Sequence, residues 1–435
     1  MILLLIFIST ILALAIPFFQ GYTLFILKLE LVIYVLMVLV NMYKTKQFNL
    51  FHTWIASFIF IIWSDMILTA ADDPSHIYTI PIFFYLIANN LVLWGYILYS
   101  NKPIAAGRIY QVAHPRYMLT LILVGIAVFF YMYYENILTT LAFGRILNDN
   151  KGGTTLTGSI VSALGLILPA LIAFYFRYVA KKSWIYSIVL SLPVLIFQAI
   201  LATRFKLLFQ IIPLFIMLGV IKVKDNTIKS ITILIGAVIL IGIYSSYTKE
   251  NRNYANNERR YQEQLYTANT TNDAFLSLAE EMSPEGIIKM AYLANDYFKD
   301  HSLSYGRESL TIFYFWIPRS WWSEKPTQLD HWLIRKYENV SDAHSTSSGF
   351  VGELRADFGW VALLFALLIG IVLKRCDQYI QHAFSQPQSL QMVFAAMLYP
   401  YFFFFVRSPL TASFSLIFCY LIYWGTRQTM CKRVM

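Results

Sequence analysis

Four basic side chains stand where they could hold an anion. Arg204, Arg319, Lys325 and Arg407 lie near the boundaries of predicted membrane spans. Arginine grips phosphate oxygens with two parallel N–H bonds, whereas lysine acts as a point charge. Cations placed in this way stabilise negative charge that develops during a reaction. These residues predict a binding site for a diphosphate at one membrane surface.

Glu353, His344 and Asp357 are the nearest candidates for a general base. Each can take a proton from an attacking hydroxyl group if it is properly placed. Glu353 and Asp357 are four residues apart, so they share a face if this segment is helical. Two other interpretations remain open: Glu353 as a charge that favours a helix N-terminus, and His344 as a solvated loop residue.

Motifs of soluble catalysis are absent from the sequence. There is no GxxxxGK[ST], no GxGxxG before a helix, no GxSxG and no HExxH, which argues against ATP-driven transport and the familiar hydrolases. The pair Asp72 and Asp73 resembles a metal-binding acidic pair, but a charged turn is the favoured interpretation. Because the seven histidines show no ligand spacing, we expect neither a metal nor a cofactor.

The elements that position these residues follow from composition. Of 435 residues, 58% are hydrophobic and 13% are charged, against roughly 25% charged in soluble domains. Apolar blocks of about 20 residues, the length of a membrane-spanning helix, recur along the chain. The sequence therefore predicts an all-α polytopic membrane protein of about 12 transmembrane helices. The predicted spans are 1–19, 22–40, 51–71, 77–99, 117–135, 156–176, 184–203, 205–221, 228–247, 358–373, 389–406 and 409–425.

Lysines and arginines in the short loops predict the orientation, because they resist translocation. One face collects sixteen of them and the opposite face only five. Both termini are therefore predicted to be cytoplasmic. The formal charge of +10 is then a signal of topology, and no nucleic-acid partner is implied. The sixteen are Lys44, Lys46, Lys102, Arg108, Arg116, Arg177, Lys181, Lys182, Lys222, Lys224, Lys229, Lys374, Arg375, Arg427, Lys432 and Arg433.

One long segment interrupts the spans. Residues 1–247 hold the first nine predicted spans, 248–357 form a large periplasmic loop, and 358–435 hold the last three spans with a cytoplasmic tail. The loop mixes charges with apolar patches, which predicts amphipathic helices at the membrane surface. Ser283 and Pro284 indicate the start of one such helix, which would end near Phe298.

Polar residues inside spans are costly and suggest function. By the predicted topology, Glu30, Asp65, Gln198 and Gln210 lie in the outer half of the membrane. We therefore expect them to line one polar cavity beneath the loop, although they could instead satisfy one another within the bundle.

Three segments of the loop together resemble a known family. They read YGRESL at 305–310, IPRSWWSEKP at 317–326 and STSSGFVGELRADFGW at 345–360. The second and third resemble the PR-x-x-W-x-x-KP and GE-L/I-x-x-x-FGW-x-G elements of Wzy-type oligosaccharide repeat-unit polymerases, with Val361-Ala362 where Leu-Gly is common. The stretch ATRFK at 202–206 is similar to the SRG stretch of these proteins, with Phe205 in place of the small residue.

The resemblance implies a C-type glycosyltransferase-like bundle in the bacterial inner membrane. It implies a metal-independent transfer of a growing glycan from undecaprenyl diphosphate to a new undecaprenyl-diphosphate-linked repeat unit. Glu353 or His344 would then be the base, and Arg204, Arg319, Lys325 and Arg407 would bind the diphosphate. Expected partners are the lipid-linked donor and acceptor, membrane lipids and a chain-length regulator. An O-antigen ligase, a lipid-linked oligosaccharide flippase and a non-enzymatic membrane scaffold remain alternatives.

Overall fold

The computed structural model is mostly helical over the residues that it describes. Helices cover eleven of the twelve predicted spans. The ninth, 228–247, lies outside the described residues apart from Gly236, as does much of the predicted loop. The described residues are 1–73, 75–99, 109–143, 156–200, 204–221, 236, 286–300, 302–314, 317, 321–322, 324, 329, 333, 347–386 and 389–434.

Five helical stretches are long and apolar enough to cross a membrane, by length and composition. Shorter apolar helices accompany them, among them Ile2–Ala15 and Gln391–Phe405. The chain is thus a mostly helical membrane protein, as predicted. The five are Gln20–Thr45, Leu50–Ala71, Thr79–Leu98, Pro115–Met132 and Gly349–Ser385.

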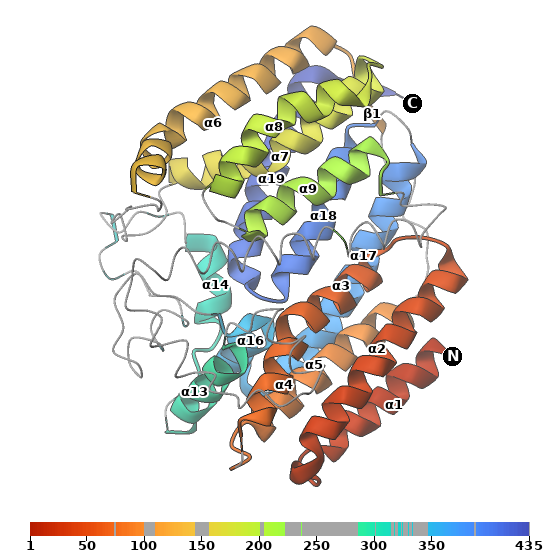
Figure 1. Ribbon diagram of the computed structural model, residues 1–435, viewed down its shortest axis with the longest axis vertical. Coiled ribbons are helices and arrows are strands. Elements are labelled where there is room, and N and C mark those ends of the chain that lie inside the picture. Colours follow the sequence, from red (N-terminus) through yellow and green to blue (C-terminus); the bar gives the residue numbers. More distant parts are fainter. Residues whose placement is uncertain are drawn as a thin grey trace.

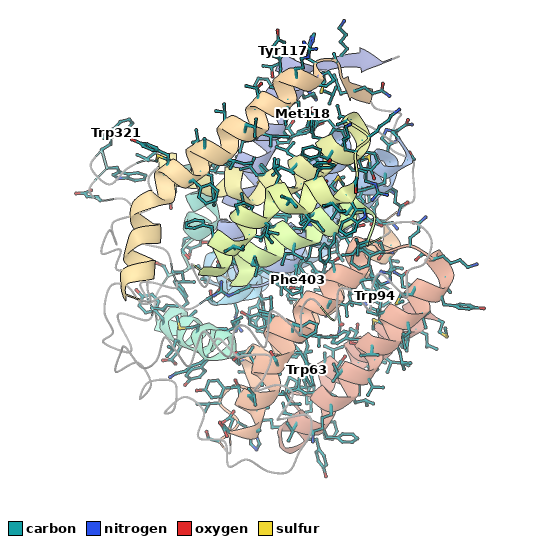
Figure 2. The ribbon with its side chains drawn as sticks, turned by 45° about the horizontal axis from the view of Figure 1, so that its top comes forward. Trp63, Trp94, Tyr117, Met118, Trp321 and Phe403 are labelled. Carbon is teal, nitrogen blue, oxygen red and sulfur yellow. The ribbon has the colours of Figure 1, made fainter. Side chains whose placement is uncertain are left out.

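The first helices pack together as one group (Figure 1). Its members are α1 (Ile2–Ala15), α2 (Thr23–Thr45), α3 (Leu50–Ser57), α4 (Ser64–Ala71) and α5 (Thr79–Leu98). The π-helical segment η2 (Phe58–Trp63) joins α3 to α4, so the three form one continuous rod. Trp63, labelled in Figure 2, is buried in this group, and its Nε1 donates to the carbonyl of Leu27 at 2.9 Å.

A second group lies beside the first (Figure 1). It contains α6 (Pro115–Phe143), α7 (Leu156–Phe174), η3 (Tyr175–Val179), α8 (Trp184–Ile200), α9 (Arg204–Leu218), α18 (Gln391–Phe405) and α19 (Pro409–Met430). Helix α17 (Ala362–Ser385) packs on both groups, against α5 and α3 on one side and α18 on the other.

The packing of α17 on α5 depends on two glycines. A Cβ on Gly95 would lie 2.2 Å from the carbonyl oxygen of Leu367, and one on Gly370 would lie 2.0 Å from that of Val92. Small residues of this kind allow membrane helices to approach closely. The crossing therefore fixes α17, and the segment that precedes it, against α5.

Helix α17 is longer than predicted. The predicted span ended at residue 373, before Lys374 and Arg375, but the helix continues to Ser385. Asp377, in this extension, is buried and accepts bonds from the N–H of Leu50 at 3.2 Å and the hydroxyl of Tyr96 at 2.8 Å. These partners on other helices hold the extension in place, which a count of charges could not indicate.

The two ends of the bundle differ. Both termini lie at one end, here named the terminus end, and three further helices lie at the opposite, loop end (Figure 1). These are α13 (Ile287–Asp300), α14 (Arg307–Tyr314) and α16 (Gly349–Phe358). At the terminus end, β1 (Ile109–Val112) pairs antiparallel with β2 (Cys431–Val434), a small addition to the predicted all-α fold.

Candidate functional site

The third motif segment begins α16 and lies on the end of α18. Ser347 donates its hydroxyl hydrogen to the carbonyl of Arg407, and the N–H of Phe350 donates to the carbonyl of Val406 at 3.2 Å. Phe350 is fully buried and its ring packs edge-on against Trp54, 5.3 Å between centroids. The structure therefore joins the motif to Arg407, a predicted anion-binding residue.

Tyr85 of α5 holds the first turn of α16. Its hydroxyl donates to the carbonyl of Ser348 and accepts from the N–H of Gly352 at 3.2 Å. A Cβ on Gly352 would lie 2.6 Å from that of Ser348, and Gly349 has a φ of +63°. Both glycines of the motif are thus required by geometry. Sequence reasoning missed Tyr85, since nothing distinguishes it from other tyrosines in spans.

Asp65 connects the membrane helices to the loop. It is buried in the first turn of α4, directly after η2. Its carboxylate accepts from the N–H of Gly286 at 3.2 Å and of Ile288 at 2.7 Å. Gly286 directly precedes α13 and Ile288 lies in its first turn, where the unpaired N–H donors need such an acceptor. The helix begins at Ile287, so the predicted start at Ser283, which lies outside the described residues, does not coincide with it.

Asp357 holds α14 in the same manner. Its Oδ2 accepts from the N–H of Ser309 at 2.7 Å and from the Ser309 hydroxyl at 2.6 Å. Ser309 lies in the first turn of α14, so the carboxylate faces the positive end of that helix. This contact gives Asp357 a structural role at the start of α14.

Glu353 and Arg355 occupy the middle of α16, a helix that precedes the predicted span ten. Glu353 is buried with 7% of its surface exposed. Arg355 lies with its guanidinium 4.4 Å from the ring centroid of Phe84 and donates to Asn295 Oδ1 at 2.5 Å. Since Asn295 is on α13 and Phe84 on α5, Arg355 ties the loop helices to the bundle.

Two predicted cations lie at the loop end. Arg407 follows α18, with its guanidinium 5.5 Å from the ring centroid of Phe404. Arg204 begins α9, five residues before Phe209, which contacts Phe404 edge-on at 5.6 Å. The start of α9 and the end of α18 are therefore neighbours. The side chain of Arg204 and all of Arg319, Lys325 and His344 lie outside the described residues.

Lys289 on α13 is a further cation at this end. The residue is half-buried, and burial lowers the pKa of its ammonium group below the usual value. A nearby anion would favour the charged form of such a desolvated ammonium group.

Three of the in-span polar residues predicted to line a common cavity have described partners. Asp65 binds the start of α13, Gln210 donates to the carbonyl of Gly165 at 3.0 Å, and Glu30 contacts Ser9 of α1. These partners lie on different helices, so the three side chains serve separate contacts. The side chain of Gln198 lies outside the described residues.

Asp73, one of the predicted acidic pair, lies in a turn as expected. It accepts from the Ser75 hydroxyl at 3.0 Å and from the N–H of Tyr78 at 2.9 Å. Among the described residues no cluster of histidine, cysteine, aspartate and glutamate could hold a metal ion.

Comparisons with protein-family models, curated proteins and solved structures gave no match to this chain.

Proposed function

We propose that this chain is a bacterial inner-membrane polysaccharide polymerase that uses lipid-diphosphate-linked oligosaccharides. The contact of the third motif segment, 345–360, with the end of α18 supports this proposal. Ser347 and Phe350 bind the carbonyls of Arg407 and Val406, so Glu353 and Arg407 share the loop end with the start of α9. A base and cations for a diphosphate are the two components that this transfer needs.

In the proposed reaction, a hydroxyl oxygen of the acceptor sugar attacks the anomeric carbon of the donor glycan. The bond from that carbon to the diphosphate oxygen breaks, and undecaprenyl diphosphate leaves with the electron pair. Arg204, Arg319, Lys325 and Arg407 stabilise its negative charge. Glu353 or His344 takes the proton of the attacking hydroxyl. The lengthened glycan remains on the diphosphate of the acceptor.

The proposal places the loop end in the periplasm and both termini in the cytoplasm. The common end of the two termini (Figure 1) and the sixteen basic residues of one predicted face agree with this orientation. Alkaline phosphatase fused after residue 300 should be active, and fused after residue 225 inactive. The reverse result would put the motif on the wrong side for a periplasmic reaction.

Lipid extracts of a deletion strain test the function itself. We expect single repeat units on the lipid carrier, because export proceeds and polymerisation does not. Completed polymer on the carrier would indicate an O-antigen ligase, and units trapped on the cytoplasmic side would indicate a flippase. Unchanged lipids and polymer would indicate a scaffold.

Complementation of that strain with arginine variants tests the site. Arg319→Ala and Arg407→Ala should leave single repeat units, and the lysine variants should recover little, because the planar fork is lost. Arg375→Ala is the matched control: its guanidinium lies 4.7 Å from the Tyr99 ring centroid at the terminus end. Full-length polymer from Arg407→Ala at normal protein level would remove this residue from the mechanism.

The base is tested with purified enzyme and synthetic lipid-linked repeat units. Glu353→Gln keeps the shape of the side chain and removes its basicity, so chain growth should fall about 100-fold or more. His344→Ala should have a smaller effect. Near-normal growth by Glu353→Gln would contradict the assignment, and loss with His344→Ala alone would transfer the role to the histidine.

A further inference from the structure

A polar cluster lies inside the first helix group, away from the loop end. Ser9 of α1 lies with its Oγ 2.5 Å from Glu30 Oε2 of α2 and 2.9 Å from Asn90 Oδ1 of α5. The hydroxyl of Tyr34 lies 3.2 Å from the same Asn90 oxygen. All four residues are fully buried. The cluster therefore exchanges no hydrogen bonds with bulk water.

Ser9 contacts more acceptor oxygens than its single hydroxyl hydrogen can serve. A serine hydroxyl donates one hydrogen, yet Ser9 Oγ lies within bonding distance of two acceptor oxygens, on Glu30 and Asn90. One added proton on Glu30 Oε2 satisfies every contact. Glu30 then donates to Ser9, Ser9 donates to Asn90 Oδ1, and Tyr34 donates to the same oxygen.

Turning the Asn90 amide is the other assignment that the contacts allow. The amide would then donate to Ser9 and Tyr34, and Ser9 would donate to an ionised Glu30. This leaves the Tyr34 hydroxyl without this acceptor. It also leaves a full negative charge on a buried carboxylate with one hydroxyl donor, and its Oε1 has no hydrogen-bond partner. The neutral carboxyl avoids both penalties and leaves the Asn90 Nδ2 group without a partner instead. An unpaired neutral amide costs far less than an isolated buried charge.

No basic side chain compensates Glu30 among its contacts in the described part of the chain. The elements packed on the cluster have few charged or titratable groups. α1, the 3₁₀ segment η1 (Gln20–Tyr22) and η2 contain no charged residue. α3 contains His52, bonded to Asn41 and Asn49, and α4 contains Asp65, bonded to α13. The remaining groups on these elements are Lys28, Lys44, Tyr34 and Tyr43 on α2, Tyr22 on η1, and Tyr85 and Tyr96 on α5. Helices α13, α16 and α17 also pack on α5. The charged groups of α13 and α16 lie at the loop end, whereas Lys374, Arg375 and Asp377 of α17 contact Tyr96 and Tyr99 near the other end of α5.

We propose that Ser9, Glu30 and Asn90 form a proton-binding site within the packing of α1, α2 and α5, and that Glu30 is protonated in the folded protein. The ligand is a single proton, which the carboxyl takes up when the helices pack. This site is separate from the proposed transfer reaction and does not depend on it.

The proposal predicts a pH dependence of known sign. An exposed glutamate titrates near pH 4.3, so at neutral pH the unfolded chain lacks the proton that the folded chain holds. Folding then takes up one proton, and the unfolding constant rises about tenfold per pH unit from this group. Glutamine imitates the neutral carboxyl and has no such dependence.

The test compares purified wild type and Glu30→Gln in detergent, unfolded at pH 5.5, 6.5 and 7.5. The ratio of the wild-type to the variant unfolding constant should rise about tenfold per pH unit. Asp65→Asn is the matched control, because Asp65 accepts from two backbone N–H groups and an amide keeps only one acceptor oxygen. This variant should be destabilised at every pH tested. A ratio for Glu30→Gln that does not change with pH would overturn the proposal.

Infrared spectroscopy gives a second measurement. The carbonyl absorption of a protonated carboxyl should be present in the wild type at pH 7 and reduced in Glu30→Gln. Glu30→Ala, which supplies no amide, should lose the same absorption even if it is less stable. An unchanged absorption in both variants would overturn the proposal.

Discussion

The carboxyl groups of the loop end and that of Glu30 have different surroundings. Asp65 accepts from two backbone N–H groups at the start of α13, and Asp357 accepts from Ser309 in the first turn of α14. Helix N-termini have partial positive charge and favour an ionised carboxylate. Glu30 meets one serine hydroxyl. The donors that tertiary structure brings therefore decide whether a buried carboxyl caps a helix, as Asp65 and Asp357 do, or binds a proton, as we propose for Glu30.

The two loop-end carboxylates also differ from each other. Asp65 belongs to a helix of the bundle, so it ties α13 directly to the membrane part. Asp357 belongs to α16, so it ties one loop-end helix to another. We therefore expect the loss of Asp65 to disturb the whole loop end, and the loss of Asp357 to disturb mainly α14.

The largest effect should come from Asp65→Ala. Two N–H groups of α13 lose their acceptor in a buried place, so the free energy of unfolding should fall by about 2–4 kcal/mol. Denaturation in detergent measures this change. Proteolysis should also cut the loop faster. Asp65→Asn, which keeps one acceptor oxygen, should lie between wild type and alanine; equal stability of all three would show that the contact does not anchor α13.

Asp357→Ala should have an intermediate effect, about 1–2 kcal/mol in the free energy of unfolding, because one helix cap is lost. Ser309→Ala removes only the hydroxyl donor and leaves the N–H bond, so its loss should be smaller. The double variant should lose little more than Asp357→Ala alone. Additive losses would mean that the two side chains act independently, against the observed contact.

Ser9→Ala should have the smallest effect and sharpens the comparison. Beside a neutral Glu30 it removes uncharged hydrogen bonds, which are worth about 0.5–1.5 kcal/mol in the free energy of unfolding. Beside an ionised Glu30 it would remove the carboxylate's donor, with a loss of about 3 kcal/mol or more. Thr10→Ala is the control, since its hydroxyl also lies on α1 and donates to the carbonyl of Ile6 at 2.7 Å.

Local properties of the sequence predicted the elements well. Apolar runs located helices at eleven of the twelve spans, because burial in lipid requires about 20 apolar residues whatever the neighbours are. The apolar residues around Ile287 and Ala291 predicted an amphipathic helix, and α13 buries both. Hydropathy acts through residues close together in the chain, so the sequence alone determined the helical membrane class and the existence of a loop helix.

The use of individual polar residues was decided by tertiary structure. Asp65 meets a backbone N–H 221 residues away, and Tyr85 meets the carbonyl of Ser348 263 residues away. Backbone donors and acceptors are present at nearly every position, so residue type does not indicate which one a side chain will meet. The motif and its glycines could therefore be selected from the sequence. The contacts of Asp65 with the start of α13, of Tyr85 with α16 and of Glu30 with Ser9 depend on the packing of distant helices, and only the tertiary structure decided them.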